Sequence, residues 1–344
     1  MNKIACLGSA ERAELFGECA NRLDLAASLI EKDFWVCWVL KQIFSIESLA
    51  RTCLFKGGTS LSKVFRLIDR FSEDIDLAVD YGPLGFTGNR CPTRPGLSRT
   101  KQQQLLADML EACRLYVAGE FLETLLRRFE RILGAGSAWN LQVDALDGNV
   151  VRFRYPMAIS EQVAYIRPEV VLELGTHAEF VPRGEFEIQS YTAQEFPGLF
   201  ADPAVRLSCL LAKRTFWEKV TILHAEHHRP AAKPFPGRYS RHYYDVAMIA
   251  PTAIGQEALE DVELLRQVVR HKQAFYPAAW ARYDLAEPGS LKLLPPEPRL
   301  AALKQDYRSM SVMLFGNPPS FETLLKTLGR CERQINAARA MCAT

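Results

Sequence analysis

The sequence predicts an α+β protein in which a half that contains a small sheet is followed by a helical half. Three observations support this prediction. Residues 52–80 have the pattern strand, glycine turn, helix, strand; residues 139–193 alternate in the manner of strands; and helical periodicity dominates after about residue 200. We therefore expect two domains, residues 1–195 and residues 196–344.

The bulk composition is that of a globular protein. With 344 residues, of which 48% are hydrophobic, the chain can bury a sizeable core. A net charge of +2 gives no global preference for nucleic acid or membrane. No apolar run approaches the ~18 residues that span a bilayer, and no secretory pattern opens the chain. The nine cysteines form no C-x-x-C pair, so we expect free thiols and a cytoplasmic protein.

The first half begins with a predicted helix, because apolar residues from Leu23 to Leu40 recur at helical spacing. The β-prone run "TCLF" ends at Gly57-Gly58, and "SLSKVFRLIDRF" (60–71) then has helical periodicity. The run "DIDLAVD" (74–80) alternates and predicts a strand.

Glycines and prolines fill residues 81–100 and predict a long loop. A long helix is expected over residues 101–133, ended by Gly134 and Gly136. The strands expected next lie in "WNLQVDALD", "VVRFRYPM", "VAYIRPEVVLELG" and "EFEIQSYTA", with turns at Asp147-Gly148-Asn149 and Pro182-Arg183-Gly184.

The second half is predicted to be helical throughout. Residues 204–228, "AVRLSCLLAKRTFWEKVTILHAEHH", have the pattern of one long helix. A Pro-rich loop follows at 228–240, then a helix that begins at "RHYYDVAMIA", and two or three further helices.

Two carboxylates on one predicted strand indicate a metal site. Asp74 and Asp76 stand two residues apart, so on a strand both side chains point to the same face. Like charges this close repel one another, and hard oxygen ligands suit Mg²⁺. An exposed acidic strand face is the alternative interpretation.

The glycine turn before that strand indicates a phosphate site. Glycines allow close backbone approach, and amide groups at a helix start attract phosphate. The sequence contains neither a P-loop nor a dinucleotide-binding pattern. Turn and carboxylates together would hold a metal-bound nucleoside triphosphate for in-line displacement. The expected nucleotide-binding residues in the turn are Lys56, Gly57, Gly58, Thr59 and Ser60.

Four motifs together resemble a known family. They are "EKDFWVCWVL" (31–40), "FKGGTSLSKVF" (55–65), "RFSEDIDLAVD" (70–80) and "RHYYDVAMI" (241–249). As a set they are similar to the AbiEii/AbiGii toxins, which are nucleotidyltransferases of bacterial abortive-infection and type IV toxin–antitoxin systems within the DNA polymerase β-like superfamily. The resemblance implies a small mixed sheet that carries the active site and a helical domain that closes its cleft.

The resemblance also implies further site residues. A third carboxylate belongs on a later strand, and Glu173 in "VVLELG" is the candidate, with Asp144 as the alternative. The family's helical Lys and later Asp correspond to Lys219 and Asp245, where Lys219 would neutralise the triphosphate. Lys213 is the alternative to Lys219.

The family pattern is not matched everywhere. Family members more often have Asp where this chain has Glu173, and His242 stands where they carry an Asp before Asp245. Mg²⁺, or Mn²⁺ in its place, and an NTP are the implied cofactor and substrate. A cognate antitoxin is the implied partner, without implied direct contact.

Local charge indicates the second substrate. Between residues 206 and 242 there are eight Lys or Arg residues and only two acidic ones. A polyanionic acceptor fits such a segment, and RNA, in particular the tRNA 3′ end that related toxins modify, is the expected one. The expected RNA-binding residues are Lys213, Arg214, Arg229, Lys233, Arg238 and Arg241. Interleaved aromatics would stack on bases: Phe216, Trp217, Tyr239, Tyr243 and Tyr244.

Two charged motifs have no assigned catalytic role. His224, His227 and His228 have a spacing that can hold Zn²⁺, but a polar helix end against the Pro-rich loop is favoured. Lys32 and Asp33 are expected to form a capping or interdomain ion pair. The rival functions are a non-catalytic nucleotide- or RNA-binding module and a phosphotransferase that acts on a protein.

Overall fold

The computed structural model describes residues 1–136, 138–160, 167–176 and 180–341, and the chain divides into two compact units. The first unit comprises Met1–Val64 and Glu73–Leu210, and the second comprises Phe65–Ser72 and Leu211–Thr344. The helical unit therefore begins at Leu211, later than the expected residue 196, and it takes in a short segment of the N-terminal half.

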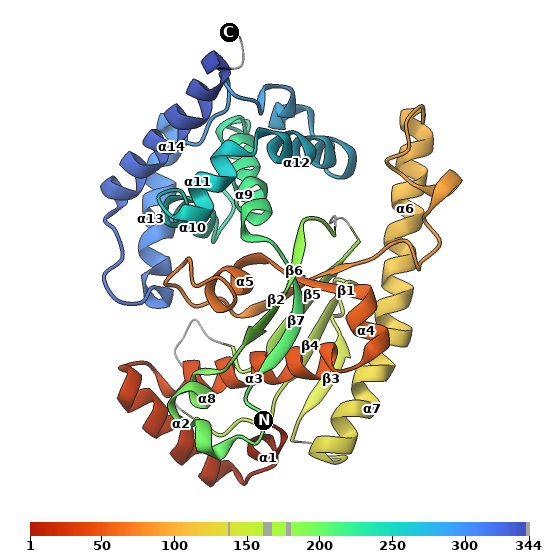
Figure 1. The fold of residues 1–344 in the computed structure, drawn as a ribbon, viewed down its shortest axis with the longest axis vertical. Helices are drawn as coiled ribbons and strands as arrows, with labels where there is room; N and C mark the ends of the chain where they lie inside the picture. Colours follow the sequence, from red (N-terminus) through yellow and green to blue (C-terminus); the bar gives the residue numbers. More distant parts are fainter. Residues whose placement is uncertain (137, 161–166, 177–179, 342–344) are drawn as a thin grey trace. The chain divides into compact units, whose positions relative to one another are not determined.

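The first unit combines a sheet with flanking helices (Figure 1). Its helices are α1 (Asn2–Ala5), α2 (Ser9–Leu23), α3 (Ala27–Phe44), α4 (Glu47–Thr52), α5 (Gly57–Lys63), α6 (Arg99–Tyr116), α7 (Leu122–Leu133) and α8 (Tyr191–Glu195). Its strands are β1 (Cys53–Lys56), β2 (Asp74–Val79), β3 (Asn140–Val143), β4 (Val150–Arg154), β5 (Val170–Gly175), β6 (Arg183–Ile188) and β7 (Val205–Leu210).

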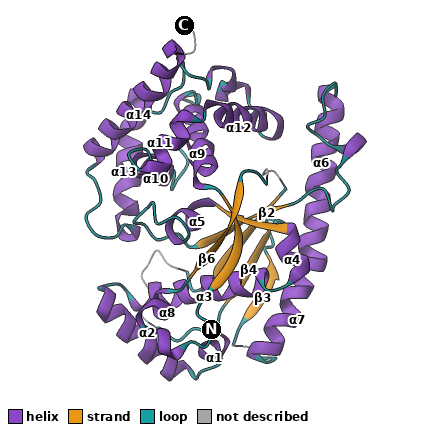
Figure 2. Ribbon diagram, viewed as in Figure 1, coloured by secondary structure: helices purple, strands orange, loops and turns teal. Residues whose placement is uncertain are grey.

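The strands of the described residues form one seven-stranded mixed sheet, drawn in orange in Figure 2, in the order β3-β4-β5-β2-β1-β7-β6. The pairs β2/β5 and β1/β7 are parallel, and the other neighbours are antiparallel. Strand β2 thus lies centrally between β5 and β1. Ile75 and Leu77 are buried, so the alternation of the sequence anchors one face of β2 in the core and leaves Asp74 and Asp76 on the other. The predicted α+β class with a mixed sheet is confirmed.

Helix α3 forms the centre of the first unit's core. It contacts β7, β2 and β5, and its side chains are buried on all sides rather than along one stripe. Its Trp38 lies 4.6 Å from the ring of Phe129, which lies 4.8 Å from that of Phe153. The predicted start of this helix is wrong, because Asp24, in the left-handed region at φ 52°, ends α2 before α3 begins.

The long helix expected over residues 101–133 is confirmed. Helix α6 continues through a π-helical turn, η2 (Val117–Phe121), into α7. Gly134 ends α7 with φ at 78°, a backbone conformation that glycine adopts without strain. The preceding loop contains only the short 3₁₀ turn η1 (Gly88–Arg90).

The helix predicted over residues 60–71 is shorter in the structure, where α5 ends at Lys63. Arg66 takes a positive φ of 52°. The following residues bond to the helical unit instead: Phe71 N–H donates to the carbonyl of Met313, and Phe315 N–H donates to that of Asp69. Tertiary bonding thus overrides the local helical periodicity.

The single helix predicted over residues 204–228 is wrong at its start. Residues Val205–Leu210 form β7, and α9 (Ala212–His227) follows. Val205, Leu207 and Cys209 are buried in alternation, which is the period of a strand. The turn expected at residues 182–184 is also corrected, because β6 already begins at Arg183, paired with Leu210.

The second unit is helical. Its further helices are α10 (Ser240–Ile249), α11 (Ala253–Glu260), α12 (Val262–Phe275), α13 (Leu300–Met310) and α14 (Phe321–Met341). Short 3₁₀ turns complete the two units: η3 (Pro197–Leu199) in the first, and η4 (Ala279–Ala281), η5 (Tyr283–Leu285), η6 (Glu297–Arg299) and η7 (Ser311–Met313) in the second. Among the described residues, no helix has the length and apolarity needed to cross a membrane.

Candidate functional site

A row of charged residues crosses the middle of the sheet. Asp76 on β2 pairs in register with Glu173 on β5 and with Lys56 on β1. Residues paired across neighbouring strands point to the same face. Asp74, two residues before Asp76, shares that face. We refer to Asp74, Asp76 and Glu173 as the carboxylate row.

The glycine turn makes room for this row. Gly57 has φ at 80°, and a Cβ atom added there would overlap the carboxylate of Asp76. Position 57 therefore requires glycine twice, once for its backbone conformation and once for the close approach of the acidic side chain. The "KGGTS" run and the D-x-D strand thus form one local structure.

The hydroxyls of the turn have structural partners. Thr59 Oγ1 donates to the carbonyl of Asp74 at 2.5 Å, and Ser60 Oγ donates to that of Gly57 at 2.8 Å. Both residues are buried. The Thr59 bond connects α5 directly to the start of β2, and the Ser60 bond lies within α5. A role for either hydroxyl in phosphate binding remains a prediction.

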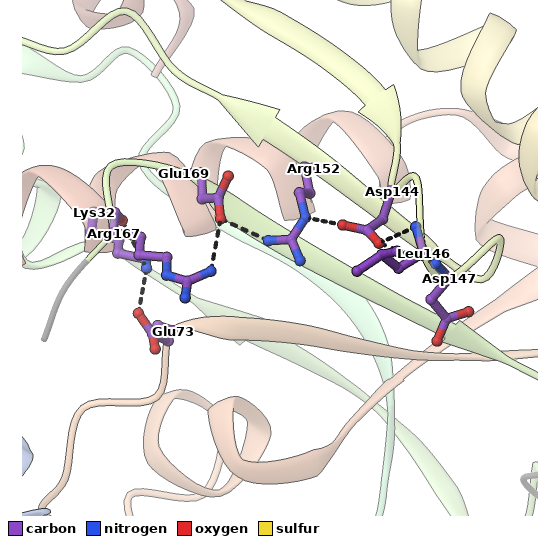
Figure 3. A network of polar contacts seen from close by, with 8 residues as sticks. All are labelled: Lys32, Glu73, Asp144, Leu146, Asp147, Arg152, Arg167 and Glu169. Carbon is purple, nitrogen blue, oxygen red and sulfur yellow. Dashed lines mark hydrogen bonds and ion pairs between the residues drawn. The ribbon is translucent and has the colours of Figure 1, made fainter.

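The structure distinguishes the two candidates for the third carboxylate. Glu173 is the direct neighbour of Asp76, whereas Asp144 follows β3 at the far side of β4 and β5. Asp144 is bonded to the guanidinium of Arg152 and accepts the backbone N–H groups of Leu146 and Asp147 (Figure 3). The geometry therefore favours Glu173.

The neighbouring carboxylates affect the pKa of Asp74. Burial, followed by repulsion from the neighbouring carboxylates of Glu73, Glu173 and Asp76, raises the pKa of Asp74 to about 7. Within the described residues, no three His, Cys, Asp or Glu side chains are already gathered as a metal-binding cluster. The backbone register aligns the donors, and their oxygens are of the kind that Mg²⁺ prefers; the residues present fit such a cation.

A buried ion trio lies in the second unit. Asp245 on α10 accepts two bonds from Arg70, Nε to Oδ1 at 2.7 Å and Nη2 to Oδ2 at 2.9 Å. The ammonium of Lys219 on α9 lies 2.8 Å from Asp245 Oδ2. All three side chains are buried. Lys219 and Asp245, expected as partners, are thus brought together, and Arg70 joins them.

The trio contains two cations and one anion. Burial alone would raise the pKa of Asp245, but Arg70 and Lys219 hold it well below its usual range. Burial lowers the pKa of Lys219, against the opposing effect of Asp245. His242 Nδ1 lies 3.5 Å from the Lys219 ammonium, and burial together with Lys219 lowers its pKa well below the usual value. His242 is therefore a neutral neighbour of the lysine.

Only part of the predicted RNA-binding set is exposed. Arg214 is completely buried and paired with Glu218, so its predicted role at a surface is wrong. Arg229 makes two bonds to Glu226 and lies over the ring of Trp280. Lys213 pairs with Asp261. Lys233 and Arg238 are exposed and Arg241 is half-buried.

The predicted stacking residues are mostly core residues. Four of the five predicted stacking residues are buried: Phe216, Trp217, Tyr243 and Tyr244. Trp217 also donates its indole N–H to the carbonyl of Ala258 at 3.1 Å. Only Tyr239 is partly exposed. A role for the four buried rings in base stacking is therefore excluded by their burial.

Two of the three histidines, His224 and His227, bond to backbone groups. His224 Nδ1 accepts the N–H of Lys292 at 3.1 Å, and its Nε2 bonds to the carbonyl of Arg282 at 2.9 Å. His227 Nδ1 lies 2.7 Å from the carbonyl of Leu294. His224 and His227 thus attach residues 282–294 to α9. The end of α9 is polar, as the favoured alternative predicted. Its His224 and His227 bond to residues 282–294 and not to the Pro-rich loop.

Sequence reasoning missed two contacts beside these clusters. Arg70 is the first residue of the motif "RFSEDIDLAVD", but its bond to Asp245, 175 positions away, has no local signal in the sequence. Glu73, directly before the carboxylate row, pairs with Lys32. Lys32 and Asp33 form separate ion pairs, with Glu73 and Lys63, and both pairs lie inside the first unit. The interdomain alternative for these two residues is wrong.

A mixed sheet whose central D-x-D strand lies against a glycine turn is the arrangement of a nucleotidyltransferase. Residues 38–327 match the family model described as the nucleotidyl transferase AbiEii toxin of type IV toxin–antitoxin systems. The chain belongs to this family and is a nucleotidyltransferase.

A solved structure has a similar fold over most of its length. MenT4, a nucleotidyltransferase toxin from Mycobacterium tuberculosis H37Rv, is 16% identical to this chain with a TM-score of 0.50. The similarity covers 94% of this chain and 89% of MenT4. No curated protein matches the sequence.

Proposed function

We propose that this toxin uses Mg²⁺ to transfer a nucleoside monophosphate from an NTP to a hydroxyl of RNA in the cytoplasm, with the tRNA 3′ end as the expected acceptor. The observation that carries the proposal is the carboxylate row placed against Gly57. Two aspartates on one strand face and a glutamate in register beside them give the oxygen donors that a divalent cation requires.

Asp74, Asp76 and Glu173 would hold Mg²⁺, or Mn²⁺ in its place. The cation supplies charge neutralisation for a transferring phosphoryl group. One of these carboxylates would accept the proton of the attacking acceptor hydroxyl. The hydroxyl oxygen attacks the α-phosphorus, the bond to the β-phosphate breaks, and pyrophosphate leaves.

The remaining residues would bind the triphosphate. Lys56, the cross-strand neighbour of Asp76, contributes positive charge, and Gly57 to Ser60 contribute backbone amides. Lys219 would neutralise the triphosphate, with Asp245 orienting its ammonium at 2.8 Å. The ammonium of Lys219 supplies the compact positive charge that a phosphate group requires.

The RNA acceptor is supported by the exposed part of the basic segment, which includes Lys233 and Arg238. An antitoxin encoded with the toxin is the expected partner, as the family description implies a toxin–antitoxin system.

The test is incubation of the protein with each labelled NTP, Mg²⁺ and total RNA, followed by separation of RNA, protein and pyrophosphate. We expect labelled RNA with one or more NTPs and release of pyrophosphate. Asp74→Asn with Asp76→Asn should abolish labelling. Full activity of that double variant would refute the metal role, and labelled protein without labelled RNA would refute the RNA acceptor.

A second comparison tests Lys219 against its alternative. Lys219→Ala should weaken NTP binding by about tenfold or more, because a charge-assisted contact to phosphate is lost. Lys213→Ala, which removes only a partly exposed ion pair with Asp261, should leave NTP binding within about twofold. Equal effects of both changes would contradict the assignment.

A further inference from the structure

Three consecutive buried charges on α3 contact three different segments of the first unit. Glu31 accepts the backbone N–H groups of Ala158 and Ile159, at 2.7 and 3.1 Å. Asp33 pairs with Lys63, the last residue of α5. Lys32, between them, is bonded to Glu73 and to the carbonyl of Arg167. A run of three buried ionisable residues is costly unless each has a partner, and here each one does.

Lys32 has the most informative partners (Figure 3). Its ammonium lies 2.5 Å from Glu73 Oε2 and 3.1 Å from the carbonyl oxygen of Arg167. Its side chain is 1% exposed. Glu73 immediately precedes β2, and Arg167 stands three residues before β5. One buried ammonium therefore connects the beginnings of two strands.

These two strands carry the whole carboxylate row. Strands β2 and β5 are parallel neighbours, with Asp74 opposite Val171 and Asp76 opposite Glu173. Because a slip of one residue would move a side chain to the other face, the relative position of the two strand starts determines whether Glu173 stands beside Asp76.

The segment before β5 is held from its other side as well. Glu169 Oε1 accepts from Arg152 Nη1 at 2.7 Å and lies 4.0 Å from Arg167 Nη1. Arg152 continues to Asp144 at the end of β3 (Figure 3). The network thus crosses the sheet from β3 to the start of β2, and Lys32 is its connection to the residue before Asp74.

We propose that Lys32 is a positioning residue of the transferase site, which fixes the starts of β2 and β5 so that Asp74, Asp76 and Glu173 share one face in register. This inference rests on the proposed role of those carboxylates. Lys32 also balances the charge of Glu73, which would otherwise add to the negative charge directly before Asp74.

The first test is hydrogen exchange on the metal-free protein, comparing Lys32→Met with Glu31→Gln. Glu31 is the matched control, because it is the adjacent residue, equally buried, and bonded to a segment outside β2 and β5. Lys32→Met should speed exchange about tenfold at residues 74–76 and 171–173. Glu31→Gln should speed it around residues 158–159 and not at the two strands. Unchanged protection of β2 and β5 in Lys32→Met would overturn the proposal.

The second test separates positioning from general stability. At a temperature where all variants are folded, Lys32→Met should lower kcat and raise the Mg²⁺ concentration for half-maximal transfer, each about tenfold. Adding Glu73→Gln should restore part of both losses, because it removes the carboxylate with which Lys32 had paired. Normal kcat and Mg²⁺ dependence in folded Lys32→Met would show that Lys32 serves stability alone.

Two further measurements keep the inference testable. If Lys32→Met does not fold, Glu73→Ala, which leaves Lys32 bonded to Arg167, should loosen β2 and not β5; uniform loosening or none would overturn the proposal. Stabilisation of the wild type by Mn²⁺, and its loss in Asp76→Asn, reports on the metal role separately. Absence of that stabilisation would refute the proposed metal site, while the exchange data would still decide the role of Lys32.

Discussion

The carboxylate row of the first unit and the ion trio of the second unit differ in how their charges are held. Asp74, Asp76 and Glu173 carry the same charge, and the backbone register of two strands keeps them on one face. Asp245 is held by opposite charges, with both Arg70 and Lys219 within 2.9 Å. The carboxylates of the row are held together by the backbone register, whereas the residues of the trio are held together by attraction between opposite charges.

The difference has an energetic consequence. Repulsion between like charges lowers the free energy of unfolding until a ligand neutralises them. Each carboxylate of the row therefore contributes little to stability. In the trio, the negative charge of Asp245 compensates the cost of burying Arg70 and Lys219. Removing one carboxylate should therefore have opposite effects on the free energy of unfolding in the two places.

The largest effect is expected from Asp245→Ala. It leaves two buried cations without their shared anion, which costs about 3–5 kcal/mol. Urea unfolding at pH 7 measures the loss. The control is Asp284→Ala, since Asp284 and its partner Arg282 are both exposed, and this change should cost less than about 1 kcal/mol. Equal stability of the two variants would show that the ion pairs of the trio do not stabilise the protein.

The next largest effect on stability is expected from the protonation of the buried His224 in acid. Burial, aided by His228 and His227, lowers the pKa of His224 to about 4, against the opposing effect of the bond to the Arg282 carbonyl. In the neutral ring, Nδ1 accepts the N–H of Lys292. The unfolded chain binds this proton at its ordinary value of about 6.5. The contribution of neutral His224 to the free energy of unfolding is therefore fully present above pH 6.5. It falls by about 3 kcal/mol as the pH drops to 4.

The measurement for His224 is urea unfolding at pH 7 and pH 4.5 in wild type and His224→Gln. Other titrating groups are common to both proteins and cancel in the difference. The wild type should lose more stability in acid than the variant, which has no group to protonate at this position. Identical pH dependence would contradict the assignment of a neutral, backbone-bonded His224.

The first-unit site was more predictable from sequence than the second-unit trio. Gly57, Asp74 and Asp76 lie within twenty positions, so the glycine turn and the alternation of one strand were enough to place them together. The residues of the trio come from three distant segments, and Arg70 lies in a stretch whose local pattern is helical. Its actual conformation depends on bonds to Met313, Phe315 and Asp245, which no local pattern reports.

Two further errors have related physical causes. The run Val205–Leu210 is apolar enough to extend the helical pattern of α9, and only its pairing with β1 and β6 makes it a strand. Counting charges between residues 206 and 242 overlooked burial. Arg214 is paired inside the protein, so it adds charge to the sequence without adding charge to the surface.

A smaller effect, of opposite sign, is expected from Asp76→Asn. The amide has nearly the same shape and still fits against Gly57, while one of the repelling charges is removed. In buffer with EDTA, the free energy of unfolding should stay constant or rise by up to about 1 kcal/mol, although transfer is lost. Thermal and urea unfolding provide the measurement. A loss of more than about 2 kcal/mol would show that the row, like the trio, contributes to its own stability.

The smallest effect concerns the exposed charges of the second unit, which contrast with its buried ones. Each RNA phosphate contacted releases counterions, with a log–log salt slope of about −0.7 per contact for single strands, so four or five contacts give a slope near −3. Lys233→Glu with Arg238→Glu should flatten this slope by about 1.4 and weaken RNA binding, while NTP binding is unchanged. Arg229→Glu serves as a contrast, because Arg229 is bonded to Glu226 and its reversal should cost stability instead.

Fluorescence anisotropy over a range of salt concentrations measures the RNA binding of the wild type and the variants. A flat salt response of the wild type would show that these exposed cations do not bind RNA, and hydroxyls of a protein would then be the acceptors to test.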